Sequence, residues 1–156
     1  MQIFVTDKCP KKSAERLQIN KTRANKMITE SQQILACCQK RILGYVSIKK
    51  ADGSLYSTPI SRMNHPVVKW ASSGYPEMTW LVMHLDSLLN YYKGDGFKNV
   101  RQNIDIMMVD IMSSGEDSYF PKSFLNFAKA DSKGLDFTAE PCVFTAYDKF
   151  LKAQGA

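Results

Sequence analysis

The sequence predicts a mainly α protein: a compact single-domain helical fold over residues 1–156, with a small β-hairpin and a short N-terminal extended arm. Apolar residues recur at helical spacing through several long segments, which favours helices over strands. The dipeptide Asp52-Gly53 stands between two alternating stretches, and this is a strong hairpin signal. A chain of 156 residues can bury one core but is short for two, so one domain is expected.

The arm and the first helices are expected in the N-terminal third. Residues 2–6 have the pattern of a short strand or extended arm, which ends at Pro10. A helical region is predicted over residues 10–41, and Asn20 is a candidate cap for a second helix inside it. Gly44 ends this region, because glycine readily adopts the left-handed conformation that closes a helix.

The hairpin and the later helices follow. The hairpin is predicted over residues 45–58, and Pro59 closes it. Apolar stripes, Pro residues near helix starts and Gly-rich breaks place the remaining helices. They are expected over residues 65–70, 76–93, 100–111, 122–130 and 140–153.

Positive charge gathers near the N-terminus. Residues 1–50 contain eleven Lys or Arg and three acids, whereas residues 101–148 carry a net charge of −4. A basic face opposite an acidic one would orient the protein on a phosphate backbone, so DNA is the expected partner. The alternative is a soluble protein whose surface charge is merely uneven.

Several classes of protein are disfavoured by the sequence. No apolar run is long enough to span a membrane, no signal peptide is evident, and the four cysteines form no CxxC pair. Walker, GxGxxG, HExxH and GxSxG motifs are missing as well. A cytoplasmic protein is therefore expected, with no membrane, no metal and no organic cofactor.

One helical strip carries candidate chemistry. Arg23, Lys26 and Glu30 are three, four and seven residues apart, which places them on one side of a helix. Two nearby cations favour an ionised Glu30, and a carboxylate beside bound DNA can stabilise a sugar cation or move a proton. The alternative is an ordinary surface ion pair between Lys26 and Glu30.

Other candidates lie outside this strip. His65 at a helix start can donate to a phosphate, or it can simply bond the local backbone. Trp80, His84 and Tyr91 share a stripe that can either stack on an extruded base or belong to the core. Lys69 is a possible phosphate contact, and a solvated surface role is the alternative.

Short motifs along the chain resemble a family of small bacteriophage proteins. They are MQIFVTDKCP at 1–10, KMITE at 26–30, NHPVVKW at 64–70, WLVMHLDSLLNYY at 80–92 and AYDKF at 146–150. That family is similar to the pyrimidine-dimer DNA glycosylase/endonuclease V group. The resemblance implies a compact helical domain and, for a phage-encoded protein, a location in the host cytoplasm.

The resemblance also implies roles for particular residues. The glycosylase group uses its terminal α-amine as the nucleophile, and Glu30 lies where a helix glutamate assists strand cleavage. Because Gln2 is bulky, Met1 is expected to stay and to supply the amine. Arg23 departs from a histidine in the group, and Lys26 and Arg41 can take over its phosphate-contacting role.

The leading hypothesis is therefore a DNA base-excision or base-processing enzyme of N-glycosylase/AP-lyase type. In it Glu30 and Met1 are catalytic, and the nucleic-acid contacts come from eight other residues. These are Arg23, Lys26, Arg41, His65, Lys69, Trp70, Trp80 and Tyr91. The alternatives are a non-catalytic phage accessory protein that binds nucleic acid, a nucleotide or a host protein, and an enzyme that acts on free nucleotides.

Overall fold

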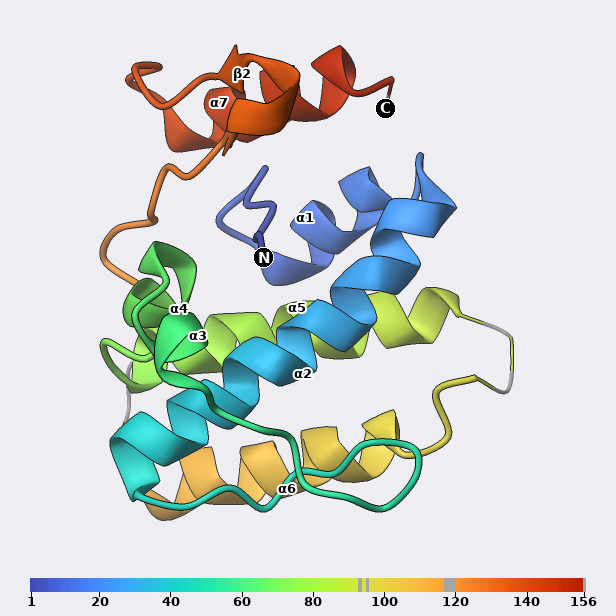
Figure 1. Ribbon diagram of the computed structural model, residues 1–156, viewed down its shortest axis with the longest axis vertical. Helices are drawn as coiled ribbons and strands as arrows, with labels where there is room; N and C mark the ends of the chain where they lie inside the picture. The colour runs from blue at the N-terminus through green and yellow to red at the C-terminus, as the bar shows by residue number, and fades with distance from the viewer. Residues whose placement is uncertain (93, 95, 117–119, 156) are drawn as a thin grey trace.

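A computed structural model of the chain describes residues 1–92, 94, 96–116 and 120–155, and the prediction of a mainly α fold is confirmed (Figure 1). Within these residues the chain forms seven α-helices, a short 3₁₀ turn and one two-stranded antiparallel hairpin. The helices are α1 (Pro10–Leu17), α2 (Lys21–Leu43), α3 (Ile60–Met63), α4 (Pro66–Ala71), α5 (Tyr75–Tyr91), α6 (Val100–Ser113) and α7 (Val143–Ala153). The hairpin consists of β1 (Lys129–Ala130), the turn η1 (Asp131–Lys133) and β2 (Leu135–Asp136).

The two ends of α2 are set by the residues that the sequence indicated. The Asn20 side chain accepts a hydrogen bond from the Arg23 backbone N–H at 3.1 Å, so it caps the helix as predicted. Gly44 closes the helix with a φ of 82°, a conformation that strongly favours glycine. These two caps fix the length of the helix that carries Arg23, Lys26 and Glu30.

Helix α5 lies at the centre of the molecule. It packs against α1, α2, α4 and α6, and in Figure 1 the long α2 crosses it obliquely. Leu81 is fully buried within it, as the apolar stripe predicted, and Trp80 on the second stripe is fully buried as well. The helix ends at Tyr91, and the end predicted at Lys93 falls outside the described residues.

The N-terminal arm is buried between the helical body and the C-terminal segment. Ile3, Phe4 and Val5 are at most 2% exposed, so the arm belongs to the core. The Phe4 ring stacks on Phe150 at 6.0 Å and meets Tyr147 edge-on at 6.3 Å, and both partners come from α7. Figure 1 accordingly shows the arm beside α1 and below α7. This burial brings the first residues of the chain next to the last helix.

The hairpin predicted over residues 45–58 is only rudimentary. It contains a single bridge, between Lys49 and Leu55, around a turn in which Gly53 has a φ of 86°. Side chains from helices form hydrogen bonds with the backbone N–H groups that a longer β-ladder would use. Gln39 accepts a bond from the Ser47 backbone N–H at 3.0 Å, and the Asn103 carboxamide oxygen accepts one from the Lys49 N–H at 2.9 Å.

The helix predicted over residues 122–130 is wrong. The segment is extended and leads into β1, because the Tyr147 side chain of α7 holds its backbone and its own Asn126 side chain bonds across to the far strand of the hairpin. The Tyr147 hydroxyl accepts from the Phe127 N–H at 3.0 Å and donates to the Leu125 carbonyl at 2.9 Å. The Asn126 carboxamide donates to the Phe137 carbonyl at 3.1 Å. The hairpin of the fold therefore lies near the C-terminus.

Two smaller features complete the comparison with the predicted elements. The last helix begins at Val143, three residues later than the predicted start at 140, and the short helix α3 was not predicted. In the part of the chain that the structure describes, no helix combines the length and apolarity needed to cross a bilayer.

Candidate functional site

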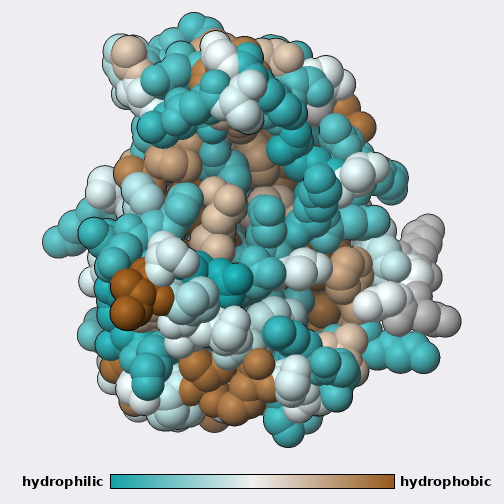
Figure 2. All heavy atoms as spheres, in the orientation of Figure 1, coloured by the Kyte–Doolittle hydropathy of each residue, from teal (hydrophilic) through white to brown (hydrophobic). Residues whose placement is uncertain are grey.

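A pocket of about 410 Å³ opens between the N-terminal arm, α2, the start of α4 and the C-terminal hairpin. Five of the residues singled out in the sequence line it together: Met1, Arg23, Lys26, Glu30 and His65. Figure 2 shows a hollow on this face, with hydrophilic residues beside it. On one side of the hollow is the C-terminal segment, which contains the hairpin and α7, and on the other side is the rest of the molecule. The pocket therefore unites both ends of the chain with the basic helix.

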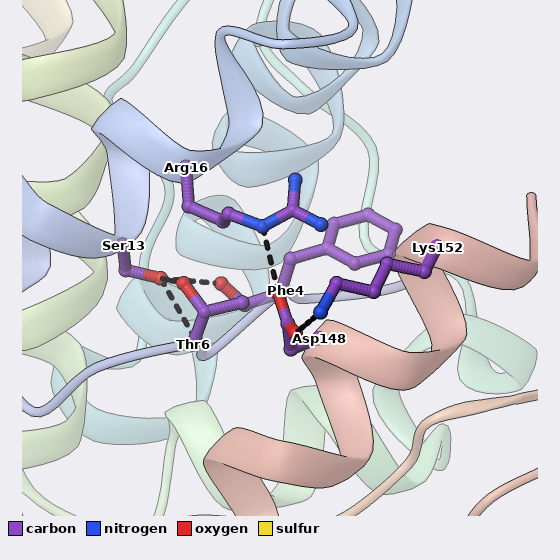
Figure 3. Close-up of polar contacts among 6 residues, drawn as sticks. All are labelled: Phe4, Thr6, Ser13, Arg16, Asp148 and Lys152. Carbon is purple, nitrogen blue, oxygen red and sulfur yellow. Dashed lines mark hydrogen bonds and ion pairs between the residues drawn. The ribbon is translucent and has the colours of Figure 1, made fainter. Parts of the chain in front are cut away.

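The arm that carries Met1 is held from the side of α1. The buried Ser13 hydroxyl donates to the Phe4 carbonyl at 2.6 Å and accepts from the Thr6 backbone N–H at 3.1 Å (Figure 3). On the other side of the arm, Arg16 of α1 forms an ion pair of 2.8 Å with Asp148 of α7. These contacts fix the arm between two helices, and residue 1 emerges at the wall of the pocket.

Helix α2 contributes two cations and one carboxylate. Their spacing places Arg23, Lys26 and Glu30 on the side of the helix that faces the pocket, while Met27 beside them is 1% exposed. Within the described residues Glu30 forms no ion pair with Lys26, so the surface-pair alternative does not hold for this structure. The carboxylate remains available to a ligand.

Arg23 is held close to the pocket floor. Its guanidinium lies over the Phe4 ring, 5.1 Å from the centroid, and this cation–π contact couples α2 to the arm. Burial lowers the pKa of Arg23, an effect that the nearby Glu30 carboxylate opposes. A buried guanidinium nitrogen, Nε, has no hydrogen-bond partner among the described residues. An anionic ligand would supply one.

His65 is both a helix cap and a pocket residue. Its Nδ1 accepts a hydrogen bond from the Val67 N–H at 3.2 Å, which caps α4. Its ring meets the Phe127 ring edge-on at 5.1 Å. Burial, and then the Met1 amine, lower the pKa of His65. Because Nδ1 accepts the Val67 bond, Nε2 is the ring nitrogen that can donate. The alternative in which His65 bonds the local backbone is therefore observed, and its role as a donor to phosphate stays a prediction for a residue that lines the pocket.

The hairpin supplies residues that the sequence analysis missed. Lys129, Asp131 and Lys133 line the pocket opposite α2. The Lys129 ammonium lies 5.3 Å from the centre of the Phe127 ring and 3.8 Å from an Asp131 carboxylate oxygen. The turn-forming residues 131–134 were the available signal, and the prediction of a helix through 130 obscured it. The pocket therefore has cations on two facing walls.

Trp80 and Trp70 do not fit the role of base-stacking platforms in this pocket. Trp80 is 0% exposed, donates to the Lys8 carbonyl at 2.8 Å and stacks on His84 at 4.9 Å, so it belongs to the core. Trp70 is half-buried, and its indole N–H donates to the Ser123 carbonyl at 3.0 Å. Both rings are held in an aromatic cluster with Phe124. The aromatic walls of the pocket come from other parts of the chain.

Three further candidates lie outside the pocket lining. Tyr91 lines a separate small pocket with Lys11 and Asp86. Arg41 donates to the Met63 carbonyl, and Lys69 is exposed on α4. Neither of these two cations lines the pocket.

The chemistry available in the pocket is that of an amine, a carboxylate and cations around partly apolar walls. An amine can attack a carbonyl or anomeric carbon, a carboxylate can move a proton, and Lys and Arg can hold phosphate. Among the described residues, no group of three or more His, Cys, Asp and Glu is arranged to hold a metal ion. Comparison with family models, with curated proteins and with solved structures found no match for this chain.

Proposed function

We propose that the protein is a DNA base-excision enzyme of N-glycosylase/AP-lyase type. The observation that carries the proposal is that Met1, the residue that bears the N-terminal amine, and Glu30 line one pocket together with Arg23 and Lys26. An amine and a carboxylate beside phosphate-binding cations are the groups that imine chemistry on a DNA sugar requires. The resemblance to the glycosylase group agrees with this arrangement.

The proposed reaction begins with the Met1 amine. Its lone pair attacks the anomeric carbon of the deoxyribose, the bond to the base breaks, and the base leaves with a proton. The amine nitrogen then loses one of its two protons, the C1′–O4′ bond breaks as the sugar opens and O4′ takes up a proton, and a protonated imine joins Met1 to C1′ of the sugar. Glu30 then removes a proton from the neighbouring sugar carbon, and the electron pair expels the 3′ phosphate.

The remaining pocket residues bind the nucleic acid. Arg23 and Lys26 on one wall and Lys129 and Lys133 on the other would contact the phosphates on either side of the reacting sugar. His65, whose Nδ1 is engaged by the Val67 N–H, can donate a hydrogen bond through Nε2 to a sugar or phosphate oxygen.

Borohydride trapping tests the imine route. Wild-type protein should form a covalent adduct with a duplex that contains an abasic site, and peptide mapping should locate the adduct on Met1. Glu30→Gln should still bind and form the adduct, but its strand cleavage should fall by about 10²-fold or more, because the proton transfer is lost.

Glu15→Gln is the matched control, because it removes the same charge from an exposed position on α1. It should cleave like the wild type. Unchanged cleavage by Glu30→Gln would remove this carboxylate from the mechanism. If no adduct forms but DNA binding weakens steeply with salt, the non-catalytic accessory protein becomes the better description.

A further inference from the structure

The Gln2 side chain joins the two ends of the chain beside the pocket. Its carboxamide nitrogen donates to the Phe127 carbonyl at 2.7 Å, across a separation of 125 residues, and lies 3.5 Å from the Lys129 carbonyl. Its carboxamide oxygen accepts from the Ile3 backbone N–H at 3.0 Å. One amide therefore ties the arm to the strand that carries Lys129.

Both attachment points of this amide are rigid. Ile3 is 1% exposed and packed into the core. Phe127 is held by the bond from its own N–H to the Tyr147 hydroxyl, and Tyr147 is fully buried on α7. A side chain bonded at both ends to fixed backbone has little freedom, so Gln2 itself has a defined position.

Met1 is the next residue, and it lines the pocket. The first residues of a chain are usually poorly ordered unless something ties them down. Here the tie is one peptide unit from the amine, and the Met1 side chain also packs against the core, so the rotations about the bonds of residue 1 are limited from both sides. The position of the amine therefore depends directly on the Gln2 amide.

We propose that Gln2 is a positioning residue, whose carboxamide holds the Met1 amine in the pocket in reach of the bound sugar. This inference rests on the proposed function, because it takes the Met1 amine as the reacting group. It adds that residues 127–129, at the far end of the sequence, are part of the apparatus that aims the nucleophile. A displacement of about 1 Å in a reacting group can cost about 10²-fold in rate.

Two variants distinguish the effect of the Gln2 hydrogen bonds from the effects of the size and charge of the side chain. Gln2→Leu removes both hydrogen bonds but remains bulky, and Gln2→Glu keeps an acceptor for the Ile3 N–H while losing the donor to Phe127. Gln18→Leu, at the C-cap of α1, is the control, because among the described residues its amide makes only a long contact of 3.5 Å, with the Ala14 carbonyl. Intact mass should confirm that Met1 is the first residue of every protein compared.

The trapping rate on abasic duplex at saturating DNA is the first measurement. Both Gln2 variants should trap about 10²-fold more slowly, with unchanged affinity for a duplex that carries a tetrahydrofuran abasic analogue and cannot form the imine. Gln18→Leu should behave like the wild type. A merely structural role would lower affinity and melting temperature instead of this rate alone. A wild-type rate in Gln2→Leu, or a loss confined to Gln2→Glu, would overturn the proposal.

A second measurement needs no DNA. The rate at which acetic anhydride acetylates the Met1 amine reports how firmly that amine is held, and it should rise in both Gln2 variants but not in Gln18→Leu. An unchanged labelling rate would overturn the positioning role. If the wild type formed no DNA adduct, the proposed function would fail, while the labelling result would still decide whether Gln2 orders the amine.

Discussion

At the residue scale, the Ser13 hydroxyl determines how firmly the arm is held. It is fully buried and serves the Phe4 carbonyl and the Thr6 N–H at once (Figure 3). Ser13→Ala should lower the free energy of unfolding by about 1–3 kcal/mol, because both backbone groups lose this partner inside the protein. Urea denaturation measures the effect.

Ser73→Ala is the comparison for this prediction. Its hydroxyl also donates to a backbone carbonyl, that of Trp70, but it does so at an exposed position where water can replace it. The expected change is within about 0.5 kcal/mol. Equal losses at Ser13 and Ser73 would show that the arm does not depend on the buried hydroxyl.

Single residues differ in how far the sequence could place them. Arg23, Lys26 and Glu30 were predictable as a group, because a helix brings residues three, four and seven apart onto one side. The contact between Gln2 and Phe127 was not, because no local rule relates residues that are 125 positions apart. Helical periodicity therefore predicted the residues that α2 contributes to the pocket, whereas the contact between the arm and the C-terminal hairpin is seen only in the tertiary structure.

At the element scale, α5 contains a buried histidine without a polar partner. His84 is 1% exposed, stacks on Trp80, and neither ring nitrogen has a hydrogen-bond partner among the described residues. Burial lowers the pKa of His84 to about 3, well below its value of 6.5 in an unfolded chain. The unfolded state therefore binds a proton at a pH where the folded state does not.

This difference predicts that acid destabilises the fold before the carboxylates titrate. Stability is fully present above pH 6.5 and falls as the pH drops toward the folded pKa, because protons favour the unfolded chain. At pH 5 the loss from His84 should be about 2 kcal/mol relative to pH 7.5. Urea denaturation at the two pH values measures it.

His84→Phe tests the assignment, because it keeps a ring against Trp80 and removes the titrating group. The variant should lose less stability than the wild type between pH 7.5 and pH 5. A smaller loss of the same sign should remain, because the pKa of His65 is lowered as well. If the variant matched the wild type in its pH dependence, His84 would not be the group responsible.

Elements also show where sequence patterns were overridden. The Asp52-Gly53 turn formed, but side chains of Gln39 and Asn103 took the backbone bonds of one predicted strand. The regular hairpin instead formed around Gly134, in a segment whose backbone is held by Tyr147. Local propensity identified the Asp52-Gly53 turn but not the turn around Gly134, and competition from distant side chains decided which of the two became a ladder.

At the scale of the whole molecule, the question is whether DNA responds to the net charge of +6 or to the arrangement of the cations. Cations from α2 and from the hairpin meet at the pocket although residues 101–148 are acidic overall. A double change of Lys129→Gln and Lys133→Gln should weaken DNA binding. It should also reduce the slope of log affinity against log salt by about 2, because two phosphate contacts are lost.

Lys11→Gln with Lys12→Gln lowers the net charge by the same amount on α1, where both side chains are exposed and neither lines the pocket. This pair should leave the salt slope nearly unchanged if DNA lies across the pocket. Filter binding or fluorescence anisotropy over a range of salt concentrations gives both slopes. The salt slope depends on the number of phosphates that the bound protein contacts, and not on charge elsewhere on its surface. Equal reductions of the slope in the two double variants would therefore mean that DNA responds only to the net charge, and that the pocket is not its binding site.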